Sequence, residues 1–271
     1  MLIYDSFTSQ PNKGNRTALI DAEKLSDQEM QDLARELGYA ESLFYKGMEL
    51  RFFSPMEEID FCGHASLAFI WNRGLEKRRG SETILTPVGE IPIFYTYKDE
   101  SLDTVWMLQA SLETRKTNLE RREFCEILGI EESDIDDSYP IMLASTGNWD
   151  LFVPIINAEV IDGISPDMDR LARLNRDMGV LSTHLYAMES GEDYDIYTRD
   201  FAPACGIPED PVTGSANGAL YGILVDNGVI SPERELIFAQ GHALGLKGRV
   251  HGIMDKKTGR ILVGGRAVQV E

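Results

Sequence analysis

Polar and apolar positions alternate with the period of an amphipathic helix in two stretches of the chain. The first opens with Ser26 and Glu29 in the spacing of a capping box and closes on Gly38. The second begins with Ser165 as the cap and Pro166 in the first turn. Both stretches contain the sequence Leu-Ala-Arg. We therefore predict helices over residues 26–38 and from residue 165 onward.

Two other segments are apolar around their whole circumference, and each follows a glycine. They are residues 65–71, after Gly63 and His64, and residues 216–224, after Gly214 and Ser215. A helix that is apolar on all sides is normally buried, so we expect each to form the axis of a half that is wrapped by a sheet. Candidate strands are residues 91–97, 105–109, 151–156, 195–199 and 261–270.

Short motifs recur in the same order in the two halves of the chain. They are Gly-Asn at 14 and 147, Leu-Ala-Arg at 33 and 171, R-x-F-[AS]-P at 51 and 199, and a glutamate five residues before a glycine-led helix start at 58 and 209. We infer an internal duplication and an α/β (α+β) fold of two similar halves with mostly antiparallel sheets. We assign residues 1–114 to the first half and 115–258 to the second. The polar stretch 113–118 is the expected crossover, and the last strand, 259–271, is free to return to the first half.

Charge and composition restrict the classes of partner. The chain has 271 residues, is 43% hydrophobic and carries a formal net charge of -19. Such a field repels phosphate backbones and anionic lipids, so we expect neither nucleic acid nor a membrane as a partner. The chain shows no basic segment followed by an apolar one at its start, and no apolar run nears the roughly eighteen residues of a spanning helix. We expect a cytoplasmic protein.

Cysteine and histidine spacing gives no sign of a metal centre. Cys62, Cys125 and Cys205 are far apart and form no CxxC pair, and the four histidines form no HxH or HExxH pattern. The glycines form neither a dinucleotide-binding nor a P-loop motif. The chain is therefore expected to use no metal and no cofactor.

The two glycine-led helix starts are the candidate binding site. Unpaired backbone N–H groups and the positive end of a helix dipole attract a carboxylate. Gly63 and Gly214 would let a substrate approach the backbone, and His64 and Ser215 would add polar side chains. The alternative is that the glycines only shape turns and that His64 is a core histidine. The duplication favours the binding interpretation, because both halves keep a polar helix start.

Two carboxylates are candidates for proton transfer. Glu41 stands in a strand-like run of aromatic and aliphatic residues, 39–45. In an apolar setting its pKa would rise, and it would exchange a proton near neutral pH; a water-facing strand glutamate is the alternative. Glu209 and Asp210 precede the second helix start, where one of them could merely complement the helix dipole.

These segments resemble a known family. Residues 58–68 and 206–216 resemble the two signatures of the phenazine-biosynthesis PhzF-like isomerases, and residues 14–15 and 40–42 fit that family's other N-terminal landmarks. The resemblance implies a diaminopimelate epimerase-like fold with an active site in a cleft between the two halves. It also implies a homodimer without a cofactor that acts on a small carboxylate-bearing metabolite. The best-known member isomerises a dihydro-hydroxyanthranilate.

The same resemblance assigns roles to individual residues. Glu41 matches the catalytic general acid/base, and His64 and Asp210 match residues that support the proton transfer. The expected substrate-binding residues begin the two helices; they are Gly63, Ala65, Gly214, Ser215 and Ala216. The chain departs from the family pattern at Arg16, where proline often follows Gly-Asn, and in the segment after Gln240 and Gly241, where an arginine is often found.

Two other functions remain open. A two-base epimerase or racemase would use a thiol from each half, and Cys62 stands in the right place, but the matching position of the second half is Thr213, which cannot form a thiolate. A non-catalytic small-molecule binding protein on the same fold is the second alternative, since fold does not fix function. Such a protein would not need Glu41.

Overall fold

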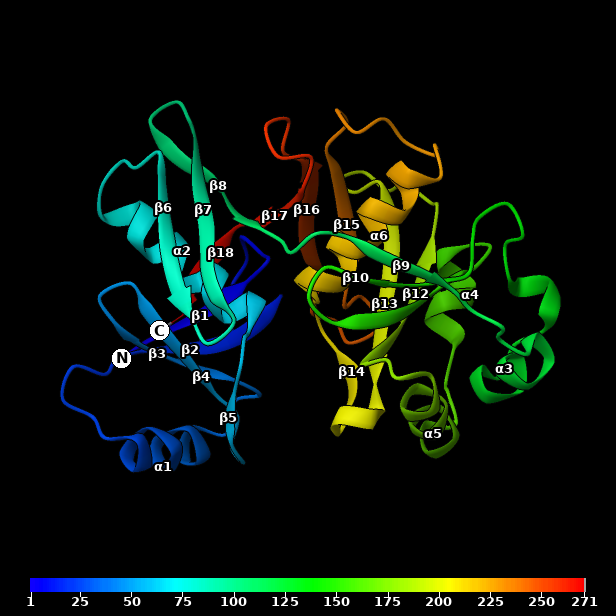
Figure 1. Cartoon of the computed structure of the whole chain (residues 1–271), viewed down its shortest axis with the longest axis horizontal. Coiled ribbons are helices and arrows are strands. Elements are labelled where there is room, and N and C mark those ends of the chain that lie inside the picture. The colour runs from blue at the N-terminus through cyan, green and yellow to red at the C-terminus, as the bar shows by residue number, and fades with distance from the viewer. Residues whose placement is uncertain (271) are drawn as a thin grey trace. The chain divides into compact units, whose positions relative to one another are not determined.

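The computed structural model describes residues 1–270 and consists of two compact units (Figure 1). The first unit is formed by Met1–Leu108 together with Val263–Glu271, and the second by Gln109–Leu262. The polar stretch that the sequence suggested as a crossover contains the strand β9 (Glu113–Lys116), which pairs with β10 (Met142–Ser145) inside the second unit. Each unit has its own set of paired strands and its own buried helix.

The first unit is a sheet of mixed direction with two helices. Its strands are β1 (Leu2–Ser6), β2 (Asn15–Asp21), β3 (Ser42–Lys46), β4 (Glu49–Phe53), β5 (Glu58–Ile59), β6 (Ser81–Thr86), β7 (Gly89–Lys98), β8 (Ser101–Leu108) and β18 (Ala267–Val270). Helix α1 (Asp27–Leu37) links β2 to β3, and α2 (Gly63–Glu76) links β5 to β6. The pairs β2–β3 and β4–β6 are parallel, while β1–β2, β3–β4, β4–β5, β6–β7, β7–β8 and β1–β18 are antiparallel.

The second unit repeats this arrangement. Besides β9 and β10 its strands are β11 (Trp149–Pro154), β12 (Ser182–Ala187), β13 (Ile196–Ala202), β14 (Ile207–Asp210), β15 (Leu236–Gln240) and β16 (Gly248–Met254), and β17 (Ile261–Gly265) begins in it. Its helices are α3 (Arg121–Leu128), α4 (Ala158–Gly163), α5 (Met168–Met178) and α6 (Gly214–Asp226), with short 3-10 turns η1 (Glu132–Asp134) and η2 (Pro203–Cys205). Here β11–β12 and β13–β15 are the parallel pairs.

Strand order and direction therefore match between the units. In each, a hairpin is followed by helical structure, a parallel strand, two antiparallel strands, a buried helix and a second parallel strand. The predicted α/β class, with two similar halves of mostly antiparallel sheet, is confirmed. All five candidate strands are present, but the last is two strands, β17 and β18, separated at Arg266.

Local capping explains where the amphipathic helices start and stop. Helix α1 has the predicted capping box between Ser26 and Glu29, and Gly38 ends it with a φ of 67°. The predicted start of the second helix at Ser165 is wrong. Helix α5 begins at Met168, because the side chain of Asp167 accepts a hydrogen bond from the N–H of Arg170 and caps the helix there.

The two apolar helices are buried, as their composition predicts. Residues 64–70 of α2 are all buried, and so are residues 216–224 of α6. Helix α2 packs against β1, β2, β3, β8 and β18, and α6 packs against β10 and β16. Neither helix has a side-chain hydrogen bond from its N-cap residue to its first turn.

A second sign of duplication is a matched pair of arginine–glutamate contacts. Arg51 binds both carboxylate oxygens of Glu58, at 2.7 Å each, and its guanidinium lies 5.2 Å from the ring centre of Phe53. Arg199 binds Glu209 in the same two-pronged way, at 3.0 and 2.8 Å, and lies 4.6 Å from Phe201. The repeated motif R-x-F-[AS]-P and the glutamate five residues before each helix thus build the same contact in both units.

Candidate functional site

Glu41 directly precedes Ser42, the first residue of β3, and so lies just outside the strand. Its backbone carbonyl accepts a hydrogen bond of 3.0 Å from the hydroxyl of Thr17, which is fully buried on the neighbouring strand β2. Its side chain is 17% exposed. The side chain of Glu41 therefore has limited access to water and does not face the solvent, as the alternative required.

His64 and Cys62 meet Glu41 at the start of α2. His64 is the second residue of the helix, and its Nε2 lies 3.6 Å from Oε2 of Glu41. The Cys62 Sγ lies 3.3 Å from Nδ1 of His64 and 3.7 Å from its Nε2. The hydroxyl of Ser6 donates to the backbone carbonyl of His64 at 2.7 Å and ties the helix start to β1. The first unit thus brings Glu41 and His64 together as expected.

Burial changes the protonation of both groups. Loss of water raises the pKa of Glu41 to about 7 and lowers the pKa of His64 to about 4. At neutral pH the imidazole is uncharged and the carboxyl is close to half protonated. The contact is therefore not an ion pair. It is a close contact, at 3.6 Å, between a neutral ring and a carboxyl group that can both take up and release a proton.

Glu41, Cys62 and His64 are also the group of described residues that could hold a metal ion, because one ligand atom of each lies within 4.8 Å of the others. A metal would need the thiolate, the carboxylate and the neutral imidazole at the same time. The raised pKa of Glu41 shows that burial opposes one of these charges. A thiol–imidazole–carboxyl contact accounts for the same distances without an ion.

Gly63 leaves room beside the helix start. A side chain built at Gly63 would find only one atom of its own unit within van der Waals range, Cε1 of Phe61 at 3.9 Å. Inside the unit, glycine is therefore not required by crowding, which agrees with a position that a ligand approaches. Ala65 is fully buried, and its methyl group belongs to the core.

The start of α6 in the second unit has a similar anchor. Ser215 is the second residue of α6, and its backbone carbonyl accepts a hydrogen bond of 3.1 Å from the hydroxyl of Thr146. Ser6 makes the same contact to His64 in the first unit. Gly214 and Ala216 are buried, whereas Ser215 is half-buried.

Of the two carboxylates before α6, only Asp210 turns towards the helix start. Glu209 is paired with Arg199, while Oδ2 of Asp210 lies 2.6 Å from the hydroxyl of Thr213, the N-cap residue of α6. The structure thus separates two neighbours that the sequence left equivalent. Thr213 occupies the place that Cys62 has in the first unit.

Sequence reasoning missed a set of buried polar residues next to Asp210. They are Asp150, Ser182, His184, Asp200, Asn217 and Gln240, each 2% exposed or less. The only signal for them was a charged residue inside an otherwise apolar strand, such as Asp150 in β11. Asp200 occupies the variable position of the repeated motif, where the first half has Phe52.

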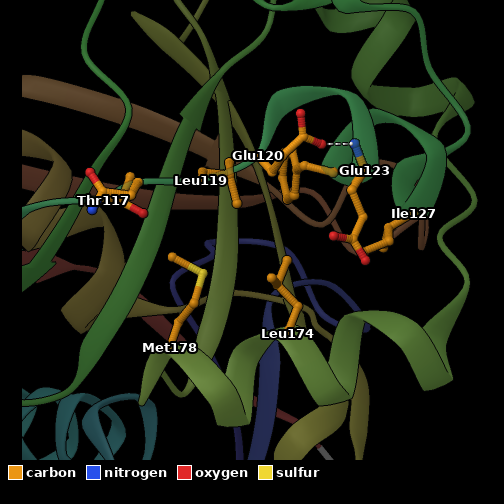
Figure 2. Close-up of a pocket in the computed structure, with 9 residues that line it drawn as sticks. Thr117, Leu119, Glu120, Glu123, Ile127, Leu174 and Met178 are labelled. Carbon is orange, nitrogen blue, oxygen red and sulfur yellow. Dashed lines mark hydrogen bonds between the residues drawn. The ribbon is translucent and has the colours of Figure 1, made fainter.

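A cavity lies elsewhere in the second unit (Figure 2). It has a volume of about 350 Å³ and is lined by the segment before α3 and by facing residues of α3 and α5, among them Leu119, Ile127, Leu174 and Met178. The carboxylate of Glu120 accepts the N–H of Glu123 beside it and caps α3. None of the predicted site residues lines this cavity.

Comparison with known proteins gives the family. A sequence model described as phenazine biosynthesis-like protein (PhzC-PhzF) matches residues 4–271. An uncharacterised isomerase of Deinococcus radiodurans is 36% identical over 98% of this chain and 88% of its own. The trans-2,3-dihydro-3-hydroxyanthranilate isomerase of Pseudomonas aeruginosa is 27% identical over 92% of this chain and 88% of its own.

A solved structure supports the same grouping. The PhzF-family phenazine biosynthesis protein of Bacillus anthracis aligns with a TM-score of 0.89 and 30% identity, over 100% of this chain and 96% of that one. The resemblance drawn from the two signature segments is confirmed. Among the described residues, no helix is both long and apolar enough to cross a membrane.

Proposed function

The chain belongs to the phenazine biosynthesis-like protein family and is an isomerase, and we propose that it moves a proton between carbon atoms of a small carboxylate-bearing metabolite without a cofactor. Glu41 is the proposed acid/base, and His64 and Asp210 support it. The observation that carries this proposal is the buried contact between Glu41 and His64, in which the carboxyl has a pKa of about 7.

A carboxyl group with this pKa suits both directions of a proton transfer. General acid–base catalysis is most effective when the pKa of the group lies near the working pH. The carboxylate form of Glu41 removes a proton from an activated C–H bond, and the electrons of that bond enter the adjacent unsaturated system. The acid form then returns the proton to a different carbon of the same system. The sum is an isomerisation with no net oxidation.

His64 and the helix starts provide the binding groups. The pKa of His64 is lowered to about 4, so its ring stays neutral and offers an N–H without adding a positive charge beside Glu41. The first-turn N–H groups of α2 and α6 and their dipoles favour a carboxylate. We assign the substrate carboxylate to these groups, with Gly63, Gly214 and Ser215 as the residues that admit it.

Asp210 and Ser215 are proposed to take part in the same reaction as Glu41. The test is a set of three variants: Glu41→Gln, Asp210→Asn and the double variant. If both residues serve one proton transfer, the double variant loses little more activity than the worse single variant. Losses that multiply would assign the residues to independent roles.

The substrate class rests on the relatives. The Pseudomonas aeruginosa relative is named for trans-2,3-dihydro-3-hydroxyanthranilate, an unsaturated ring carboxylate, which makes this compound a suitable probe for the chain. We also propose a homodimer in the cytoplasm that binds neither nucleic acid nor membrane, in line with the net charge of -19. Sedimentation of the purified protein checks the dimer.

The two-base thiol mechanism is the second candidate function, and the position of Cys62 beside His64 is the observation in its favour. Its weakness is Thr213, which stands where the second thiol would be needed. Replacement of Cys62 by serine separates the two mechanisms. A loss of turnover far larger than the loss in Glu41→Gln would support the thiol mechanism.

The proposed function is tested by turnover of the probe in D₂O. The wild-type protein is expected to place deuterium on a carbon of the probe, and Glu41→Gln to slow this by at least about 100-fold. Glu36→Gln, an exposed change on α1, is the control and should behave as wild type. If Glu41→Gln exchanges deuterium at the wild-type rate, Glu41 is not the acid/base. If the wild-type protein places no deuterium on the probe, the proposed substrate class is wrong. Binding without any exchange would favour the non-catalytic alternative.

A further inference from the structure

A continuous chain of hydrogen-bonded polar side chains runs from the buried interior of the second unit to Asp210, which is half-buried. In order along the hydrogen bonds they are Asp150, Ser182, Asp200, Thr213 and Asp210, with His184 attached to Asp200. Asp200 is 1% exposed and His184 is fully buried. Three carboxyl groups so close together, two of them buried, cannot all be charged. The hydrogen bonds limit where the protons can lie.

Two amide side chains determine which ring nitrogen of His184 carries a hydrogen. Gln240 accepts the N–H of Thr213 at 3.1 Å through Oε1 and donates to the backbone carbonyl of Asp210 at 2.9 Å through Nε2, so its orientation is settled. Asn217 donates through Nδ2 to that Oε1 and to the carbonyl of Thr213. Its Oδ1 therefore faces Nε2 of His184, at 3.3 Å. Because Oδ1 only accepts, Nε2 carries a hydrogen.

The other ring nitrogen shares a proton with Asp200. Nδ1 of His184 lies 2.9 Å from Oδ1 of Asp200. With a hydrogen already on Nε2, the proton between the two groups belongs either to an imidazolium facing a carboxylate or to a carboxylic acid facing a neutral ring. In both forms the pair has no net charge, which suits its complete burial.

The serine hydroxyl requires another proton. Oγ of Ser182 lies 2.9 Å from Oδ1 of Asp150 and 2.7 Å from Oδ1 of Asp200. A hydroxyl has one hydrogen and can donate to only one of them. Burial, and then the nearby Asp200, raise the pKa of Asp150 well above its usual range. Asp150 therefore keeps its proton and donates it to Ser182, which donates to Asp200.

The threonine hydroxyl presents the same situation at the other end. Oγ1 of Thr213 lies 3.0 Å from Oδ2 of Asp200 and 2.6 Å from Oδ2 of Asp210, and it accepts from Nε2 of Gln240 at 3.0 Å. One hydrogen again serves two carboxyl oxygens. Either Asp210 is an acid that donates to Thr213, or Asp200 is.

We propose that Thr213 and Asp200 form a proton relay through which a buried carboxyl group accepts a proton from Asp210 and returns it. In the forward direction the O–H bond of Asp210 breaks as its proton moves to Oγ1 of Thr213. At the same time the hydroxyl hydrogen of Thr213 moves to Oδ2 of Asp200. With the shared proton on His184, Asp200 begins as a carboxylate, so the negative charge passes from Asp200 to Asp210, and no oxidant or further reactant is needed.

Asp200 and Thr213 are thus positioning residues for Asp210, which is the member of the relay proposed to act on the substrate. This use of the relay rests on the proposed function. The first unit has no counterpart, because Phe52 stands at the position of Asp200 and Cys62 at that of Thr213. The shared fold therefore does not require the relay residues.

Other ionisable groups border the relay. The thiol of Cys205, in η2, interacts electrostatically with Asp150 and Asp200. Glu209, next to Asp210, is held by Arg199. Both groups stay the same in the variants chosen below, so a changed titration there reports on the relay itself.

The relay is tested without substrate, by NMR of protein that carries ¹³C in its aspartate carboxyl groups. Wild type is compared over a pH titration with Thr213→Ser, which keeps the hydroxyl, and Thr213→Val, which removes it. We expect the signals of Asp200 and Asp210 to shift together over one pH range in wild type and in Thr213→Ser, and to shift separately in Thr213→Val. Joint shifts that persist in Thr213→Val, or three ionised carboxylates at neutral pH in wild type, overturn the proposal.

A second variant covers the case in which Thr213→Val does not fold. Asp200→Asn removes the partner of His184, and ¹⁵N-histidine NMR reads the ring directly. In wild type Nε2 should be protonated and Nδ1 should share a proton; in Asp200→Asn only Nε2 should keep one. A wild-type ring without a proton on Nε2 overturns the proposal. Neither spectrum depends on turnover, so failure of the relay is distinct from failure of the proposed function.

Discussion

Nε2 of His64 lies 3.6 Å from Oε2 of Glu41, yet the two groups do not form an ion pair at neutral pH. Burial holds the pKa of the histidine at about 4 and that of the glutamate at about 7. The same loss of water favours the neutral form of each group. The start of α2 therefore places a neutral imidazole beside a carboxyl group that can change its protonation in the neutral range.

This arrangement has a cost in stability that depends on pH. Because the pKa of Glu41 is higher in the folded chain than its ordinary value of 4.5, the folded state binds the extra proton, and stability falls as the pH rises from about 4.5 to 7. Glu41→Gln keeps the neutral form at all pH values. It should exceed wild type in free energy of unfolding by roughly 3 kcal/mol above pH 7 and match it near pH 4. Urea unfolding at both pH values checks this, and an equal difference at the two contradicts it.

Because Cys62 is not proposed to react with the substrate, the replacement Cys62→Ser should reduce turnover only slightly. A serine hydroxyl can replace the thiol as the hydrogen-bonding partner of Nδ1 of His64, which lies 3.3 Å from the sulfur. We expect Cys62→Ser to keep the turnover of the probe within about tenfold of wild type, since the thiolate chemistry that serine cannot supply is not used. Initial rates at saturating probe measure it. A loss far larger than that of Glu41→Gln would instead support the two-base mechanism.

The duplicated arginine–glutamate contacts provide a matched test of burial. The side chains of Arg199 and Glu209 are 7% and 9% exposed, while those of Arg51 and Glu58 are 27% and 37% exposed. Glu209→Ala leaves a buried guanidinium without its carboxylate and should lower the free energy of unfolding by about 3–5 kcal/mol. Glu58→Ala should lower it by about 1 kcal/mol or less. Similar losses in the two variants would show that burial does not decide the strength of the contact.

Gly14 of the repeated Gly-Asn motif is expected to tolerate no side chain. Its φ is +65°, and a Cβ there would lie 2.0 Å from the backbone oxygen of Ser6. Gly38 has nearly the same φ, +67°, but a Cβ there would meet nothing within 4 Å. Gly38→Ala should therefore cost about 1 kcal/mol through backbone strain alone, and Gly14→Ala at least about 3 kcal/mol. Thermal unfolding of the two variants compares their stabilities directly. Equal losses of stability would mean that the close approach to the Ser6 carbonyl does not destabilise Gly14→Ala.

Much of the fold could be predicted from the sequence, because the patterns that indicate its helices and strands are local. The capping box of Ser26 and Glu29, the apolar circumference of the two glycine-led helices and the recurring motifs each need only a few neighbouring residues. The start of α5 was misplaced because Ser165, Pro166 and Asp167 all suit a helix start, and only the hydrogen bond from Arg170 to Asp167 selects among them.

The candidate site could be predicted only in part, because its residues come from distant parts of the sequence. Glu41 and His64 are far apart in sequence, and their contact followed from the family resemblance and not from any spacing. The relay of Asp200 and Thr213 left no recognisable pattern, because Asp200 lies in β13 and Thr213 caps α6, and only the folded chain brings the two together. Which of Glu209 and Asp210 faces the helix start was equally hidden, since the answer depends on the side chain of Arg199.

The central claim is that Glu41 gains and loses its proton near neutral pH, and its titration measures this most directly. Protein with ¹³C in its glutamate carboxyl groups is titrated by NMR, with Glu41→Gln used to assign the signal. We predict a midpoint for Glu41 near 7. A midpoint near the ordinary value of 4.5 would contradict the account, because Glu41 would then be a fully charged carboxylate at neutral pH with no proton to return.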